Sequence, residues 1–225
     1  MAAYFVTSTS TDIGKTFVTA GLIRYLREAG QAVHALKPVV SGYDPSVVET
    51  SDPAVLLSAL GRQVSADEVE GIAPWRFRAP LSPDLAAARE GRGIDFGKLV
   101  AFSRQAVDAE TGMLFIEGVG GIMVPLDAER TVLDWMAALQ IPLLLVVGGY
   151  LGTISHTLTA LDVLATRHLK VAAIVVSESE RNPVELDDTV ASIARFAHGA
   201  GVVGLPRLPG GINQHPAFAK IAALL

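Results

Sequence analysis

Residues 4–16 read YFVTSTSTDIGKT, and they join a short apolar run to the beginning of a helical pattern. The segment from Ser8 to Thr16 nearly matches the phosphate-loop pattern G-x-x-x-x-G-K-[ST], in the strand–loop–helix context that this pattern requires. In such a loop, backbone N–H groups surround phosphate oxygens, the lysine neutralises the β/γ charge, and the following hydroxyl contacts Mg²⁺. Lys15 and Thr16 hold those two positions. The alternative is an ordinary turn in which Gly-Lys-Thr arises by chance.

Ser8 stands where the pattern has its first glycine. A glycine there normally permits backbone torsions that cost another residue about 1–2 kcal/mol. A serine hydroxyl can offset part of that cost with a local hydrogen bond. We therefore expect Ser8 to be tolerated, with a nucleotide affinity within a few-fold of that of a glycine.

Five further apolar runs follow along the chain, with helical patterns between them. The runs do not alternate with polar residues, which is typical of parallel strands buried on both faces by helices. The alternation predicts an α/β fold of the P-loop NTPase type: a single doubly wound, mostly parallel sheet with helices on both faces. Ligands of such sheets bind outside the carboxyl ends of the strands. The six runs are Tyr4–Val6, Ala32–Leu36, Met113–Ile116, Leu143–Val147, Val171–Val176 and Val202–Leu205.

Eight segments carry helical patterns, and Ser82-Pro83 and Asp95 have the residue types that begin helices. The stretch from Ser41 to Gly93 has many prolines and little strand signal, so it is expected to cross the rim of the sheet. No repeat or linker interrupts the chain, and residues 1–225 are predicted to form a single domain. The helical segments are Lys15–Glu28, Pro53–Leu60, Pro83–Arg89, Phe96–Glu110, Val132–Leu139, Ile154–Thr166, Val184–Phe196 and Pro216–Leu225.

The composition excludes several classes of protein. The 225 residues are 50% apolar and 18% charged, and their net charge of −5 argues against nucleic-acid and anionic-membrane binding. The absence of cysteine excludes disulfides, a thiolate nucleophile and cysteine-bound metal. The start MAAYFVTS lacks the features of a secretory signal, so a cytoplasmic location is expected. Trp135–Leu161 is uncharged, but Pro142 and the glycines that interrupt it favour a buried strand over a membrane span.

Charged residues near the ends of other strands are candidates for a site. Glu117, directly after a buried run, resembles a Walker B carboxylate that holds Mg²⁺, although it could be a strand-ending charge. Lys37 ends the second run, and a lone lysine there is usually solvated. Asp52 precedes Pro53, and from the residues alone a helix-capping role is favoured.

Taken together, these motifs resemble dethiobiotin synthetase, the ATP-dependent enzyme family of biotin synthesis. The family's loop is similar to GTDTxVGKT, and its K-P-x-x-S-G, S-D, P-x-S-P and E-G-x-G-G motifs occur here at residues 37–42, 51–52, 80–83 and 117–121. Its L-G-x-x-N-H motif corresponds to residues 151–156. The resemblance covers almost the whole chain in order and weakens after Val176. The departures are Ser8 for Gly, Ser10 for Asp, Asp12 for Glu, Asp84 for His and Ser155 for Asn.

The resemblance implies ATP-dependent ring closure of 7,8-diaminopelargonic acid with CO₂ to dethiobiotin, through a carbamate and a carbamic-phosphoric anhydride, with release of ADP and phosphate. It also implies Mg²⁺ as cofactor and a homodimer. No covalent enzyme intermediate is needed, which fits a chain without cysteine. The site must instead offset electrostatic repulsion, because a carbamate anion must approach a polyanionic nucleotide.

The resemblance further implies roles for particular residues. Lys37 is expected beside the carbamate and the transferring phosphoryl group, Lys15 on the β/γ-phosphates, and Thr11 and Ser41 at the nitrogen-bearing end of the substrate. The Mg²⁺ ligands implied are Thr16, Asp52 and Glu117. Gly152, Thr153 and Ser155 are expected to meet the substrate's carboxylate tail from the neighbouring subunit, and His156 to be structural. The residues expected at the nucleotide are Asp12, Ile13, Gly14, Lys15, Thr16, Phe17, Asp52, Glu117, Gly118, Val119, Gly120, Ser177, Leu205, Pro206 and Arg207.

Ser177 takes the position of a family Asn that pairs with adenine, and a serine cannot present a two-pronged amide. We expect shallow base selection that rests on Ser177 and on backbone groups of Leu205, Pro206 and Arg207, unless a backbone pair reads adenine equally well. The alternative function is a ParA/MinD-type nucleotide-switch ATPase. That group has a signature lysine where this chain has Ser10. A second alternative is an amidotransferase-like synthetase of cobalamin biosynthesis, which shares the phosphate loop. Such chains normally carry a cysteine nucleophile, and this chain has no cysteine.

Overall fold

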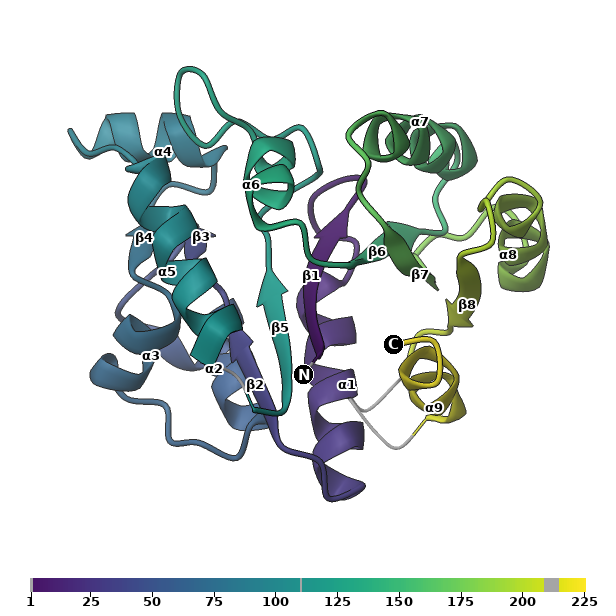
Figure 1. The fold of residues 1–225 in the computed structure, drawn as a ribbon, viewed down its shortest axis with the longest axis horizontal. Coiled ribbons are helices and arrows are strands. Elements are labelled where there is room, and N and C mark those ends of the chain that lie inside the picture. The colour runs from purple at the N-terminus through teal and green to yellow at the C-terminus, as the bar shows by residue number, and fades with distance from the viewer. Residues whose placement is uncertain (1, 110, 209–214) are drawn as a thin grey trace.

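A six-stranded parallel sheet lies at the centre of the computed structural model, which describes residues 2–109, 111–208 and 215–225. Its strands are β1 (Ala2–Ser8), β2 (Val33–Leu36), β5 (Met113–Glu117), β6 (Leu143–Gly148), β7 (Val171–Ser177) and β8 (Gly201–Leu205). Their order is β2-β5-β1-β6-β7-β8, which Figure 1 shows from left to right. The strand order switches direction beside β1, and such a switch point is where ligands of open α/β sheets bind. The predicted fold class and all six predicted strands are confirmed.

Helices pack on both faces of this sheet. They are α1 (Lys15–Glu28), α2 (Asp52–Ala59), α3 (Ala66–Ile72), α4 (Pro83–Arg89), α5 (Phe96–Ala109), α6 (Val132–Leu139), α7 (Thr153–Thr166), α8 (Leu186–Ala194) and α9 (Pro216–Ala222), with a 3-10 turn η1 (Val48–Thr50). Helix α1 packs against α2 and α9, while α5 packs against α6 and α7 against α8. The eight predicted helices are confirmed, with ends shifted by a few residues at most, although the predicted end at Glu110 lies outside the described residues. The predicted start at Asp95 is also confirmed, because its side chain accepts a hydrogen bond from the Lys98 backbone at 3.0 Å.

The core lies between the central strands and the helices that cover them. Every residue of β6 is buried, which confirms the prediction of a buried strand within the uncharged stretch. Phe5 in β1 packs edge-on against Trp135 of α6, with ring centroids 4.8 Å apart. No helix in the described ranges is long and apolar enough to cross a membrane.

A second, two-stranded sheet lies beside the main one and was not predicted. Its parallel strands are β3 (Val39–Ser41) and β4 (Trp75–Phe77), so the expectation of little strand structure between Ser41 and Gly93 is wrong at β4. Strands of three residues are too short to show a period in the sequence. Helix α3 was also missed, although Ser65 and Glu68 fit a helix-start pattern. Its cap is present, since the Glu68 N–H donates to Ser65 Oγ at 3.2 Å.

Candidate active site

The phosphate-loop segment leaves the carboxyl end of β1 and enters α1. Gly14 precedes the helix with φ 93°, a left-handed conformation that favours glycine, and a Cβ there would lie 2.9 Å from Ser177 Oγ. Asp12 is left-handed as well, with φ 57°. Ser8 is not, because it continues the strand and pairs with Val146 of β6. The torsional cost expected at Ser8 is therefore wrong: the unusual backbone lies four residues later, at Asp12.

The Lys15 side chain folds back into this loop and is only 7% exposed. Its ammonium donates to Ser8 Oγ at 3.0 Å and to the Ser10 carbonyl at 3.4 Å. Burial lowers the pKa of Lys15 to about 8, and the nearby charge of Lys37 acts in the same direction. The local hydrogen bond expected of Ser8 is present, since its hydroxyl lies 2.6 Å from the Ser10 carbonyl.

Lys37 is buried in an ion-pair cluster and is not a solvated charge. Its ammonium donates to Glu117 Oε1 at 2.7 Å and to the Gly118 carbonyl at 2.8 Å, and it lies 3.2 Å from Asp52 Oδ2. Burial by itself lowers the pKa of Lys37, but the carboxylates of Glu117 and Asp52 outweigh it and hold the pKa above its ordinary value. Lys37 therefore keeps its positive charge next to the phosphate-loop segment.

Asp52 does not cap α2, because Ser51 does so. The Ala54 N–H donates to Ser51 Oγ at 3.4 Å, and Asp52 is the first residue of the helix itself. Burial raises the pKa of Asp52, but the Lys37 ammonium outweighs that effect and the net pKa lies below the ordinary value. The Asp52 carboxylate is thus ionised beside Lys37, and the capping alternative for it is wrong.

Three oxygen-bearing side chains meet where the magnesium site is predicted. Thr16 Oγ1 donates to Glu117 Oε1 at 2.6 Å, and Thr16 and Asp52 line the same cavity. Glu117 is fully buried, and within the described part of the chain its Oε2 has no hydrogen-bond partner. A buried carboxylate oxygen without a partner, beside a hydroxyl and a second carboxylate, fits Mg²⁺, which takes oxygen ligands and completes its shell with substrate phosphates. Among the described residues, there is no group of three or more His, Cys, Asp or Glu side chains that could hold a metal ion. The substrate phosphates would therefore have to complete the ligand set.

A cavity of about 640 Å³ opens beside this cluster. It brings together two lysines, two hydroxyl residues expected at the substrate, and an apolar wall. Ser41 Oγ is buried and, among the described residues, lacks a hydrogen-bond partner. The lining residues are Thr11, Asp12, Gly14, Lys15, Thr16, Phe17, Lys37, Val40, Ser41, Asp52, Pro80, Leu81, Ser82, Pro83, Val119, Gly120 and Val124.

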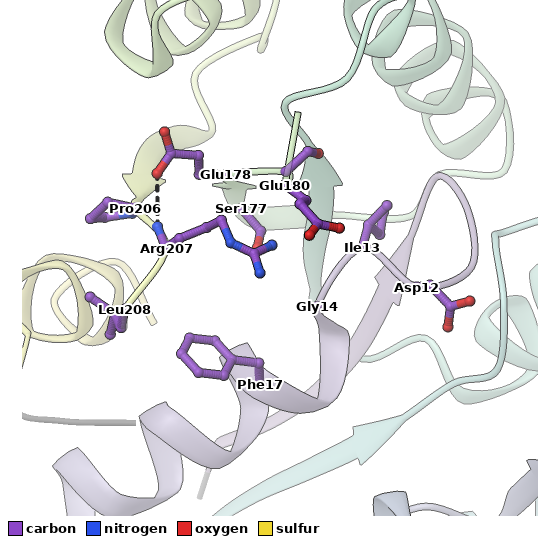
Figure 2. A pocket seen from close by; sticks show the side chains of 11 residues that line it. Asp12, Ile13, Gly14, Phe17, Ser177, Glu178, Glu180, Pro206, Arg207 and Leu208 are labelled. Carbon is purple, nitrogen blue, oxygen red and sulfur yellow. Dashed lines mark hydrogen bonds between the residues drawn. The ribbon is translucent and has the colours of Figure 1, made fainter. Parts of the chain in front are cut away.

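A second cavity of about 620 Å³ shares Asp12, Gly14 and Phe17 with the first. Figure 2 shows Phe17 of α1 on one side of it and, opposite, the residues that follow β7 and β8. Its lining includes Ile13, Ser177, Pro206 and Arg207 as expected. Sequence reasoning missed Glu178, Ser179, Glu180 and Leu208, although their places directly after strand ends could have indicated them.

The two strand ends that border this second cavity are joined by hydrogen bonds. The Arg207 N–H donates to Glu178 Oε2 at 2.8 Å, drawn as a dashed line in Figure 2. The Glu178 N–H donates to the Leu205 carbonyl at 2.9 Å. Leu205 is buried and does not line the cavity, so the structure does not bring it into the nucleotide contact expected of it.

The residues expected at the substrate's carboxylate lie outside both cavities. Gly152 precedes α7 with φ 96°, and Ser155 is exposed. Thr153 is buried, and its hydroxyl donates to the Gly148 carbonyl at 2.7 Å. That hydroxyl is therefore engaged within the turn. His156 Nδ1 lies 2.9 Å from the Tyr150 hydroxyl.

Comparison with known proteins finds relatives that agree with one another in name and cover most of the chain. The AAA domain family matches residues 2–215. The chain is 50% identical over 196 residues to the ATP-dependent dethiobiotin synthetase BioD of Acidiphilium cryptum, covering 87% of this chain and 88% of that one. It is 47% identical over 208 residues to the enzyme of the same name from Caulobacter vibrioides, covering 92% and 93%.

Solved structures match the fold at low sequence identity. The MinC:MinD cell division protein complex of Aquifex aeolicus matches with TM-score 0.56 and 14% identity, covering 93% of this chain and 82% of that one. Such a likeness shows a shared P-loop fold and does not favour the switch-ATPase alternative. The relatives at high identity decide the assignment: this chain belongs to the dethiobiotin synthetase family.

Proposed function

We propose that this chain is an ATP-dependent enzyme that forms dethiobiotin from 7,8-diaminopelargonic acid and CO₂, with release of ADP and phosphate. The observation that carries the proposal is the buried Lys37, held by Asp52 and Glu117 in one cavity with Lys15 and Ser41. This arrangement offers two cations to a reaction between anions. The two relatives named above support the same reaction.

The reaction proceeds in three bond-forming steps. One amine of the substrate adds to CO₂ and loses a proton, which gives a carbamate. A carbamate oxygen attacks the γ-phosphorus of ATP, the bond from that phosphorus to the bridging oxygen breaks, and ADP leaves. The second amine then attacks the carbamate carbon and loses a proton, the bond from that carbon to the phosphate oxygen breaks, and the ureido ring closes as phosphate leaves.

Lys15 and Lys37 would offset the repulsion between the carbamate and the nucleotide. Preorganised charges in a site that excludes water are the largest contribution to many such reactions, because they need no reorganisation as charge develops. Lys37 is suited to this role, since Glu117, Gly118 and Asp52 fix its ammonium before substrate binds. Ser41 and Thr11 provide hydroxyls in the same cavity for the amine-bearing end.

Thr16, Asp52 and Glu117 would hold Mg²⁺. When bound, the ion would neutralise charge on the β- and γ-phosphates and help orient them. Glu117 Oε2 is the side-chain oxygen most available for it, because within the described ranges no other group satisfies it. Asp52 lines the same cavity, and its side chain is 45% exposed.

Phosphate release separates this function from a nucleotide switch. Purified protein with ATP and Mg²⁺ is expected to release phosphate only when diaminopelargonic acid and bicarbonate are both present. Omitting either one is the control. A switch ATPase would ignore the pair, and phosphate release that is independent of both compounds would contradict the proposal.

We expect the nucleotide cavity to select its base weakly. Ser177 is short, its Oγ lies close to Gly14, and it cannot match an adenine edge with two hydrogen bonds. A good bidentate contact is worth about 1–3 kcal/mol, so its absence removes roughly one to two orders of magnitude of preference. CTP and GTP should replace ATP with a modest loss of kcat/KM, and Ser177→Asn should sharpen the preference for ATP. A thousandfold preference for ATP in the native protein would show that other groups read the base.

We also expect a homodimer of two-fold symmetry. Met123 is 55% exposed and lines an open, largely apolar groove between residues 122–125 and helix α7, and Leu151, which is 84% exposed, comes just before that helix in the chain. Exposed apolar clusters of this kind typically mark protein interfaces. Sedimentation at micromolar concentration should show a dimer, which Leu151→Asp should weaken. A fully active monomer at that concentration would contradict the expectation.

A further inference from the structure

The Ser8 hydroxyl joins three parts of the site. It is fully buried and accepts a hydrogen bond from the Lys15 ammonium at 3.0 Å. Its single hydrogen faces two carbonyl oxygens, that of Ser10 at 2.6 Å and that of Gly120 at 2.8 Å. One side chain thus connects the phosphate-loop lysine, the backbone of the loop, and the turn that follows β5.

Lys15 depends on this hydroxyl for most of its local hydrogen bonding. Within the described residues, the hydrogen bond from the same ammonium to the Ser10 carbonyl is long, at 3.4 Å. A buried ammonium without partners is costly, so loss of the hydroxyl would let the long side chain leave its place. A glycine at this position has no group that could hold it.

The same hydroxyl also links the turn after Glu117 to the loop through a hydrogen bond to the Gly120 carbonyl. The Ile122 N–H donates to the Ser8 carbonyl at 3.0 Å, and a Cβ on Gly121 would lie 3.1 Å from the Thr9 carbonyl. The turn and the loop are therefore in close contact already. The bond from Ser8 to the Gly120 carbonyl adds a side-chain link between them.

We propose that Ser8 is a positioning residue that orients Lys15 toward the β-phosphate of a nucleoside di- or triphosphate. An ammonium has three N–H donors, so the bond to Ser8 and the longer one to the Ser10 carbonyl leave one donor free for a phosphate oxygen. The proposal rests on the proposed function, because it concerns the site to which that function assigns the nucleotide. It replaces the expectation of a few-fold effect for Ser8→Gly, which assumed a backbone cost that the structure does not have.

Ser8→Ala tests this proposal, because alanine keeps the Cβ and suits the extended backbone. Binding of ATP, ADP and AMP is measured by titration calorimetry. We expect about tenfold weaker binding of ATP and ADP, the order expected for loss of one hydrogen bond to a charged group, with AMP unchanged. A general disturbance of the loop would weaken all three nucleotides, so AMP distinguishes positioning of Lys15 from a structural role.

Thr7→Val is the matched control. Thr7 is the preceding residue in β1, it is 1% exposed, and in the described structure its hydroxyl has no hydrogen-bond partner. This variant removes a buried hydroxyl from the same strand without touching Lys15. It should leave binding of all three nucleotides unchanged.

A double-mutant cycle with Lys15→Met shows whether Ser8 acts through Lys15. Effects of residues that act through one another do not add, so Ser8→Ala should have no further effect on ATP binding in the Lys15→Met background. Unchanged ATP affinity in Ser8→Ala, an equal loss for AMP, or additive effects would each overturn the inference alone. A native chain that bound neither ATP nor ADP would overturn the proposed function together with it.

Discussion

Replacing Lys37 with glutamine is expected to lower kcat by about 100- to 1,000-fold, the usual cost of removing one preorganised transition-state donor. The physical reason is that the carbamate and the γ-phosphate would approach each other without the charge that Lys37 provides. Steady-state kinetics at saturating ATP and diamine measures the effect. Wild-type kcat would show that the ammonium takes no part in the reaction.

The stability of this variant needs its own control. Glu117 is fully buried against Lys37, and breaking a buried pair on one side typically costs about 3–5 kcal/mol. The double variant Lys37→Gln with Glu117→Gln removes both charges and should recover much of that loss in thermal unfolding. It should not recover turnover. Lys98→Gln, at a side chain that is 78% exposed, serves as the matched control and should change neither.

Glu117→Gln is expected to raise the Mg²⁺ concentration for half-maximal activity by roughly ten- to 100-fold, because a buried carboxylate attracts a divalent ion strongly. Asp52→Asn should act in the same direction but less, since its side chain is half exposed. Activity is measured against Mg²⁺ at fixed, saturating ATP. The exposed Glu49→Gln is the control.

A different result for Glu117→Gln and Asp52→Asn would contradict their role as magnesium ligands. If thermal stability falls while the Mg²⁺ dependence stays unchanged, Glu117 and Asp52 serve only to neutralise Lys37. Circular dichroism melting curves in the absence of nucleotide provide that comparison.

Local sequence was sufficient for the features that depend on neighbours in the chain. The strand–loop–helix around Gly14 is formed by consecutive residues, and each main strand contains a mostly apolar run, although His34 interrupts the run at β2. Strands β3 and β4 have three residues each, so they are decided by pairing with each other and not by any local period.

The side-chain contacts of the site could not be predicted in the same way. Lys37 and Glu117 lie 80 positions apart, and only the sheet register makes them neighbours. The role of Asp52 was ambiguous because Ser51, beside it, is an equally good cap. The torsional cost expected at Ser8 is wrong because the loop pattern gives residue types but not torsions, whereas the hydroxyl hydrogen bond expected there is present.

One measurement tests the central claim most directly: incubation of the purified chain with ¹³C-bicarbonate, ATP, Mg²⁺ and 7,8-diaminopelargonic acid, with product analysis by mass spectrometry and a parallel phosphate assay. The account predicts dethiobiotin that carries one ¹³C in its ureido carbonyl, with one phosphate released for each molecule formed. Phosphate release without labelled dethiobiotin, or no turnover of the complete mixture by folded protein that binds ATP, would contradict it.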